Sequence, residues 1–288
     1  MKTPDLDAAA RFLAGSGRVL ERRCYERLLS GGAAQPVRDA VAAYRNSDGG
    51  FGHGLEPDGR TPASQPPAVE LALRILNETD AWEEELVTGA CDWLLANSPA
   101  AGGASFVEPT VEGWPHAPWW SPQEGQGASL ATTGQVAGTL HARGVVHPWL
   151  ERATELLWSL VGDLSRPDAY EMRGALAFLQ HVPDRARAEE AFDRVGRVLL
   201  EQGLVALDPA AAGEVHTPLN FAPEPTSLAR RLFDSQTIGA HLDHLAGGQA
   251  ADGGWTFNWF VWSMPAEIEW RGYVTVDALR VLKLNERL

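Results

Sequence analysis

Hydrophobic residues recur along most of the chain at spacings of three and four, which is the pattern of amphipathic helices. In residues 84–97 and 185–202 the apolar positions fall on one helical face. The same reading predicts helices over residues 5–14, 17–30, 35–45, 66–78, 84–97, 127–143, 148–161, 168–181, 185–202, 227–232, 234–246 and 270–285. No segment alternates as a strand would, so we expect an all-α fold.

The connections between these expected helices are of two kinds. Those at residues 79–83, 144–147 and 182–184 are short, whereas those at residues 46–65, 98–126, 203–226 and 247–269 are long. Successive connections of an antiparallel helical array lie at opposite ends, so the long loops should gather on one face. Proline and tryptophan are concentrated in the long loops, which indicates ordered loops packed over the helix ends.

A short motif recurs after two of the expected helices. The segment Asp48-Gly49-Gly50-Phe51 reappears as Asp252-Gly253-Gly254-Trp255, and Gly102-Gly103-Ala104-Ser105-Phe106 is a degenerate third copy. Glycine permits the positive φ with which many helices end, and the aromatic ring can fold back onto that end. A repeated motif implies a repeated structural unit, and we expect its role to be structural.

The second copy has a further feature, because Gln249, Gly253 and Trp255 have the spacing Gln-x-x-x-Gly-x-Trp. This segment resembles the QW repeat of squalene and oxidosqualene cyclases and of protein prenyltransferase β subunits. Residues 45–51 are similar, with Arg45 in place of the glutamine. The resemblance implies an α/α toroid of about six helical hairpins, with inner and outer helix layers, in a single domain over residues 1–288. Twelve expected helices fit that count.

The catalytic motifs of these families have no full counterpart in the chain. The string nearest to the Asp-x-Asp-Asp acid motif of the cyclases is Asp5-Leu6-Asp7-Ala8, and neither Cys24 nor Cys91 has the aspartate that precedes the zinc-binding cysteine of prenyltransferases. His241 and His244 are one helical turn apart, but no second pair has matching spacing. We therefore predict no metal site and no cofactor.

Charge and composition narrow the choice of partners and location. A formal net charge of −14 disfavours nucleic acid and anionic membranes, because like charges repel. The hydrophobic fraction of 44% suffices for a sizeable core, yet no apolar run is long enough to span a membrane. Two cysteines are too few for a disulfide framework, which favours a reducing cytoplasm. The oligomeric state stays open.

Polar and aromatic residues of the long loops are the candidates for a functional site. A carboxyl group walled by tryptophan would have a raised pKa and could donate a proton, whereas nearby helix N-termini would oppose that role. We name Asp58 and Glu56 as candidate catalytic residues and His116 as the alternative. The candidate substrate-binding residues are Arg60, Trp119, Trp120, Trp259, Trp270 and Arg271. Any one of these residues could instead cap a helix or bridge two loops.

Three functions are compatible with this pattern. The first is a terpenoid cyclase-like or prenyltransferase-like protein that binds, and as an enzyme transforms, a small isoprenoid-like ligand with an apolar body and an anionic end. The second is a carbohydrate-active toroid, in which tryptophan stacks on sugar rings and two carboxyl groups about 5–10 Å apart share acid and base work. The third is a non-catalytic binding or scaffold protein. An apolar cavity lining would favour the first function, and a polar lining the second.

Overall fold

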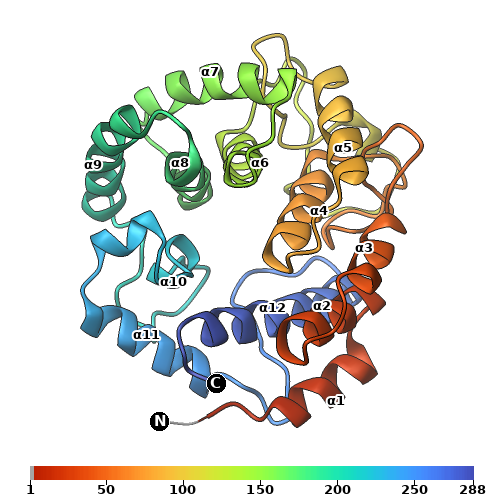
Figure 1. The fold of residues 1–288 in the computed structure, drawn as a ribbon, viewed down its shortest axis with the longest axis vertical. Coiled ribbons are helices and arrows are strands. Elements are labelled where there is room, and N and C mark those ends of the chain that lie inside the picture. Colours follow the sequence, from red (N-terminus) through yellow and green to blue (C-terminus); the bar gives the residue numbers. More distant parts are fainter. Residues whose placement is uncertain (1–2) are drawn as a thin grey trace. The chain divides into compact units, whose positions relative to one another are not determined.

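A computed structural model describes residues 3–288, and every regular element in that range is helical (Figure 1). The expected all-α class is thus confirmed. The α-helices are α1 (Leu6–Ser16), α2 (Val19–Leu29), α3 (Gln35–Ala42), α4 (Pro66–Glu78), α5 (Glu84–Ala96), α6 (Leu130–Ala142), α7 (Pro148–Gly162), α8 (Ala169–His181), α9 (Arg185–Glu201), α10 (Pro218–Phe221), α11 (Ser235–Gly247) and α12 (Met264–Leu284). Two 3-10 helices, η1 (Pro109–Val111) and η2 (Leu228–Leu232), complete the described elements. Among the described residues, no helix combines the length and hydrophobicity needed to cross a lipid bilayer.

Most helix boundaries follow the sequence pattern, and the main differences lie near the long loops. α12 begins at Met264 instead of residue 270, because Ser263 caps its first turn and Pro265 occupies a position where its missing N–H is not needed. Arg271 therefore lies inside this helix and not at its start. The short α10 lies within a segment expected to be loop, and the helix expected over residues 227–232 is the 3-10 helix η2.

The chain forms two compact units. The middle unit comprises residues 38–201, and the terminal unit comprises residues 1–37 and 202–288. The terminal unit is therefore assembled from both ends of the chain, while the middle unit is continuous. The expectation of one domain over residues 1–288 stays a prediction.

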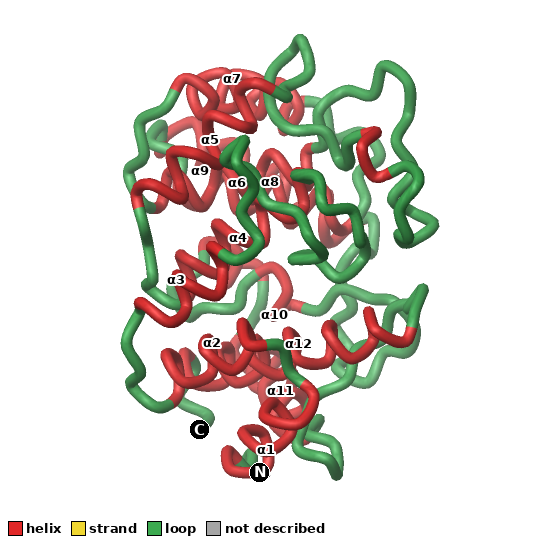
Figure 2. Tube along the Cα trace, turned by 90° about the vertical axis from the view of Figure 1, so that its right-hand side faces the viewer, coloured by secondary structure: helices red, strands yellow, loops and turns green. Residues whose placement is uncertain are grey.

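The helices of the middle unit form two layers. α4, α6 and α8 lie side by side in one layer, and α5, α7 and α9 pack against them as the second layer (Figure 1). Successive helices thus alternate between the layers. The long loops over residues 46–65 and 98–126 lie together at one end of these helices (Figure 2).

The contact between α6 and α8 is unusually close, because glycines face backbone atoms of the partner helix. A Cβ atom at Gly134 would lie 2.3 Å from the Gly174 carbonyl oxygen, and one at Gly174 would lie 2.4 Å from the Leu130 oxygen. Gly138 approaches the Ala177 oxygen in the same way, at 2.5 Å. No side chain fits at these positions, so the three glycines set the spacing of the two helices.

In the terminal unit, α12 packs against α1, α2 and α11. Its core draws on both ends of the chain, joining Ala9 of α1 to Leu242 of α11 and Leu279 of α12. Gln249 closes the unit, since its side chain accepts a hydrogen bond from the Asp5 N–H and donates one to the Asp5 carbonyl oxygen, both at 2.8 Å. The glutamine of the QW-like segment therefore links the start of α1 to the loop between α11 and α12.

The two Gly-Gly motifs form the same turn, one in each unit. In the first, Asn46 N–H donates to the Gly50 oxygen at 2.9 Å and Gly49 N–H donates to the Asn46 oxygen at 3.0 Å. In the second, the corresponding bonds from Ala250 to Gly254 and from Gly253 to Ala250 are 2.8 and 3.0 Å long. The aspartate side chain of each motif accepts from the N–H two residues later, at 2.9 Å and 3.1 Å.

Each Gly-Gly turn also rests on a neighbouring helix. Gly49 has a φ of 90° and Gly253 a φ of 95°. A Cβ atom at Gly49 would lie 2.5 Å from the Gly89 oxygen of α5, and one at Gly253 would lie 2.3 Å from the Ala8 oxygen of α1. The degenerate copy follows the same plan, because Gly102 has a φ of 95° and lies against Arg152 of α7. At Gly49 and Gly253 only glycine satisfies both the backbone angle and the close contact, whereas at Gly102 the backbone angle alone favours glycine.

Candidate functional site

The two long loops of the middle unit are joined by backbone hydrogen bonds. Gly59 and His116 form an isolated antiparallel bridge. On either side of it, Arg60 N–H donates to the Pro115 oxygen at 2.9 Å and Ala117 N–H donates to the Asp58 oxygen at 2.7 Å. This junction, which we call the loop cluster, carries the predicted site residues Glu56, Asp58, Arg60, His116, Trp119 and Trp120.

The two candidate carboxylates of the loop cluster are held by N–H donors. Asp58 N–H donates to Glu56 Oε2 at 2.7 Å, and Trp119 Nε1 donates to Asp58 Oδ2 at 3.0 Å. The Asp58 side chain is buried, while Glu56 is half-buried. The tryptophan therefore orients the Asp58 carboxylate and places the edge of the indole ring beside it.

Trp119 and Trp120 occupy different surroundings although they are neighbours in the chain. Trp120 is 3% exposed, and its ring covers Gly59, where a Cβ atom would come within 2.3 Å of a ring carbon. Trp119 is 39% exposed. Trp120 thus packs over the backbone at Gly59, whereas Trp119 presents an indole surface that a ligand can contact.

His116 and Arg60 lie next to Gly59: His116 pairs with Gly59 in the bridge, and Arg60 follows it in the chain. His116 Nδ1 lies 2.6 Å from the Trp114 carbonyl oxygen. A carbonyl oxygen only accepts hydrogen bonds, so the proton is on Nδ1 and the neutral ring has Nε2 as its acceptor. Arg60 is half-buried, and its guanidinium lies near the backbone of Gly54. The loop cluster therefore combines carboxylate, imidazole, guanidinium and indole groups.

A second set of hydrogen bonds also joins the two loops, near the start of α4. Gln65, at the start of α4, donates to Thr110 Oγ1 at 2.7 Å and accepts from Glu108 N–H at 2.8 Å. Ser105 Oγ in turn donates to the Glu108 carboxylate. Gln65 is almost fully buried. Gln65 and Glu108 thus join the two loops structurally.

The loop over residues 98–126 also borders an open hollow of about 460 Å³. Its wall contains three glutamates and no lysine or arginine. The lining residues are Asn97, Ser98, Pro99, Ser105, Glu108, Pro109, Glu112, Pro122, Gln123, Glu124, Gly125 and Gln126. Such a wall suits hydroxyl donors and disfavours a phosphate or diphosphate group, because like charges repel.

The helices of the first layer, α4, α6 and α8, each carry a row of polar residues. These residues are partly exposed, because the second layer does not cover them. On each helix these positions recur every three or four residues, so they share one face. The polar members are Glu70 and Arg74 on α4, Gln135 and Thr139 on α6, and Arg173 and Gln180 on α8. Arg74 Nε donates to Glu70 Oε1 at 2.8 Å. This face of the layer is polar and not aromatic.

The other predicted aromatic residues lie in the terminal unit. Trp259 and Trp270 meet edge to face, with ring centroids 5.5 Å apart. Phe257 stacks on Trp259 at 4.3 Å, and Tyr273 meets Trp270 at 5.6 Å. The four rings form a continuous aromatic chain that leads from the loop over residues 248–263 onto α12.

Arg271, predicted to bind substrate, is engaged in the second Gly-Gly turn. Its NH1 and NH2 groups contact the two Asp252 carboxylate oxygens at 2.8 and 2.9 Å. The hydrogen bond from Arg271 lowers the pKa of the Asp252 carboxyl below its ordinary value. The guanidinium also lies over the Phe12 ring at 4.6 Å. Arg271 thus acts as a clasp between α12, the turn and α1.

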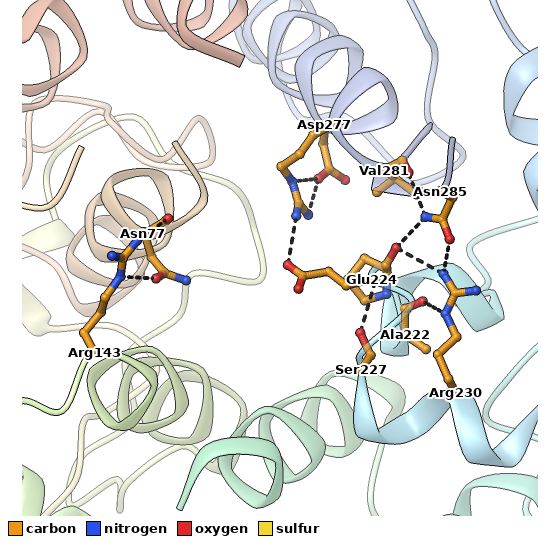
Figure 3. Close-up of polar contacts among 11 residues, drawn as sticks. Asn77, Arg143, Ala222, Glu224, Ser227, Arg230, Asp277, Val281 and Asn285 are labelled. Carbon is orange, nitrogen blue, oxygen red and sulfur yellow. Dashed lines mark hydrogen bonds and ion pairs between the residues drawn. The ribbon is translucent and has the colours of Figure 1, made fainter. Parts of the chain in front are cut away.

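Sequence reasoning missed a polar stripe on α12. Glu269, Tyr273, Asp277 and Arg280 follow one another at spacings of four, four and three, which places them on one helical face. Arg280 donates to Asp277 Oδ1 from NH2 at 2.9 Å, and its NH1 lies 3.6 Å from Glu224 Oε1. Figure 3 shows Glu224 projecting toward this part of α12. The helical spacing of these polar residues was the available signal.

His241 and Cys91 are buried titratable groups outside the loop cluster. Over the described range, no group of three or more histidine, cysteine, aspartate or glutamate side chains could hold a metal ion. His241 is buried with Nε2 3.1 Å from the Leu207 oxygen, and burial lowers its pKa. Burial raises the pKa of the Cys91 thiol to about 12, so this cysteine is not a thiolate at neutral pH.

Comparison with known proteins adds evidence on the fold alone. No protein-family model matches the sequence, and no curated protein matches it either. Among solved structures, the chain is similar to the crystal structure of a protein from Actinoplanes, with a TM-score of 0.61 and 15% sequence identity. The match covers 98% of this chain and 98% of that one. The fold therefore has a counterpart in a protein of very different sequence.

Proposed function

We propose that the protein is an α/α toroid that binds a small polyhydroxylated ligand, of carbohydrate type, at the loop cluster of the middle unit. The observation that carries this proposal is the joining of two distant loops so that the exposed Trp119 indole lies beside the buried Asp58 carboxylate. Sugar rings stack their C–H faces on indoles and donate hydroxyl hydrogen bonds to carboxylates. Both partners are present here.

The toroid part of the proposal is supported by local repetition. Helices of the middle unit alternate between two layers, and the three Gly-Gly turns rest on α5, α7 and α1 respectively. In the middle unit each of these turns rests on the second-layer helix that follows it. This regular repeat favours a ring, as in the terpenoid cyclases and prenyltransferases that the QW-like segment resembles.

The ligand class follows from the chemistry of these surfaces. The hollow at the loop over residues 98–126 has a wall with three glutamates and no basic residue, and the partly exposed stripes of the first layer are polar. An isoprenoid needs an extended apolar lining for its chain and a cationic site for its diphosphate. A neutral sugar needs neither. If a reaction follows binding, Asp58 and Glu56 are the first candidates for proton transfer, with His116 Nε2 as the alternative acceptor.

A second candidate ligand keeps an apolar body and an anionic end. The aromatic chain from Phe257 to Tyr273 in the terminal unit favours it, because contiguous rings can hold an isoprenoid chain. The candidate cation of the same unit is Arg271, although its ion pair with Asp252 makes it a weaker site for the anionic end.

The test is a binding screen with matched tryptophan variants. Neutral oligosaccharides and isoprenoid diphosphates are titrated against the wild type, Trp119→Ala and Trp114→Ala by calorimetry. Trp114 is the control, because it lies in the same loop and is 48% exposed. We expect a neutral oligosaccharide to bind and Trp119→Ala to weaken it by about tenfold or more, since stacking is worth roughly 1–3 kcal/mol. Equal affinities of the two variants, or binding of diphosphates alone, would overturn the carbohydrate proposal.

A further inference from the structure

A buried arginine of the terminal unit, Arg280, contacts two carboxylates at unequal distances. The Arg280 side chain is 8% exposed. On one side its Nε and NH2 groups donate to Asp277 Oδ1 at 3.2 and 2.9 Å. On the other side its NH1 group lies 3.6 Å from Glu224 Oε1, which is longer than a hydrogen bond. Asp277 therefore anchors the guanidinium, while Glu224 only covers its NH1 side.

The backbone that carries Glu224 is fixed by other residues. Asn285 Nδ2 and Arg230 NH2 both donate to the Pro223 oxygen, at 2.8 and 3.2 Å, and Arg230 Nε donates to the Ala222 oxygen at 2.8 Å (Figure 3). Glu224 N–H donates to Ser227 Oγ at 3.1 Å. None of these bonds involves the Glu224 carboxylate. Its side chain can change rotamer without disturbing the segment that bears it.

We propose that Arg280 is a binding site for the carboxylate of a small ligand, and that Glu224 occupies this site when the ligand is absent. Asp277 holds the Nε and NH2 groups of the guanidinium, and Glu224 places a second carboxylate near NH1 through a contact longer than a hydrogen bond. The Glu224 side chain is 43% exposed, so it has room to turn outward from NH1. A ligand carboxylate at hydrogen-bond distance from NH1 would then replace the Glu224 carboxylate, while the contacts with Asp277 remain.

The carboxylate of Glu224 indicates which chemical group of a ligand Arg280 would bind. Glu224 presents a planar carboxylate, and a guanidinium matches a planar carboxylate through parallel N–H donors. A glutamate tethered beside the site competes at a high effective concentration, so binding to the wild type should be weak. The proposal concerns the terminal unit alone and does not depend on the site proposed in the middle unit.

The experiment removes the placeholder charge and measures binding of a carboxylated probe. D-glucuronate is titrated against the wild type, Glu224→Gln and Glu83→Gln by calorimetry at constant ionic strength, with D-glucose and inorganic phosphate as companion probes. Glu83→Gln is the matched control, because Glu83 also lies 3.6 Å from an arginine, Arg38, and is 42% exposed. We expect Glu224→Gln to strengthen glucuronate binding about tenfold, and Glu83→Gln to leave it unchanged.

Two further comparisons make the outcome decisive. The gain from Glu224→Gln should persist when combined with Trp119→Ala, and should disappear when combined with Arg280→Lys. If circular dichroism shows that the Arg280→Lys protein is unfolded, the comparison of Glu224→Gln with Glu83→Gln decides alone. Equal binding by those two variants would overturn the proposal. An equal gain for phosphate, or any gain for glucose, would overturn the assignment of a carboxylate ligand.

Discussion

The two Gly-Gly turns have the same backbone but different outer contacts. Asp48 in the middle unit accepts a hydrogen bond from the Ser64 hydroxyl at 2.8 Å, whereas Asp252 in the terminal unit forms an ion pair with Arg271. Arg45 reaches the exposed Glu85, but Gln249 binds the backbone of Asp5. The backbone hydrogen bonds of the turn are thus the same in both units, while the side chains around it have different partners in each unit.

The largest effect should come from substitution of the glycines themselves. Gly253→Ala and Gly49→Ala each add a Cβ atom less than 3 Å from a helix backbone at a positive φ, so we expect a loss of more than about 4 kcal/mol in unfolding free energy. Gly125→Ala is the control, since its φ of 68° is positive but no atom lies within 4 Å. It should cost roughly 1–2 kcal/mol. Urea unfolding measures all three, and equal losses would refute the role of the close contact.

Removal of the aromatic ring should have the next largest effect. Phe51→Ala and Trp255→Ala each empty a buried position and should lower stability by about 3–5 kcal/mol. Trp255→Phe makes the second turn resemble the first and loses mainly the Nε1 hydrogen bond to the Leu245 oxygen, 2.8 Å long, at a cost of about 1–2 kcal/mol. Thermal and urea unfolding test this order. A Trp255→Ala protein of unchanged stability that fails to bind its ligand would show that the turn is functional instead.

Gln249 and Arg45, at corresponding positions before the two turns, should contribute differently to the free energy of unfolding. Gln249→Ala removes two hydrogen bonds to Asp5 and one to the Gly253 oxygen, so we expect a loss of about 1–2 kcal/mol. Arg45→Ala removes an ion pair with Glu85, which is 81% exposed, and should cost at most about 0.5–1 kcal/mol. Urea unfolding of both variants decides the comparison. A larger loss for Arg45→Ala would reverse the assigned importance of the two residues.

The smallest effect should be a dependence on pH that is specific to the second turn. Arg271 lowers the pKa of Asp252 in the folded state, so the stability from this pair is present above the unfolded-state pKa of about 3.9 and is lost as the pH falls through the lower folded value. Because Asp252 is half exposed, we expect less than about 1 kcal/mol. Arg271→Gln should therefore destabilise the protein more at pH 7 than at pH 3. Arg11→Gln controls for net charge, and the same pH dependence in that variant would contradict the prediction.

The helices and the Gly-Gly turns were accessible from the sequence because their signals are local. Apolar spacing of three and four places a helix without knowledge of its neighbours, and a glycine pair before an aromatic ring reports a helix end. The same holds for the loop cluster in part. Composition indicated ordered loops rich in tryptophan and carboxylates, and the structure brings Asp58 and Trp119 together from two of them.

Pairing between distant residues was not accessible. Nothing local shows that Arg271 binds Asp252, so it was expected to serve a ligand. The sequence likewise gives no sign that Gly134 faces Gly174, because that contact is set by which helices become neighbours. The stripe containing Asp277 and Arg280 shows in the sequence as helical spacing of polar residues, but that spacing does not reveal its contact with Glu224. A single sequence describes each segment well and the partners of each segment poorly.

The link between Gln249 and Asp5 has a consequence for the order of folding during synthesis. The apolar face of α1 is synthesised before the middle unit, whereas its partners in α11 and α12 are synthesised after it. The middle unit, residues 38–201, is continuous and can assemble while the remainder is still being translated. We therefore expect α1 and α2 to wait as an exposed apolar segment until the C-terminal helices arrive. Chaperone dependence should be concentrated in that interval.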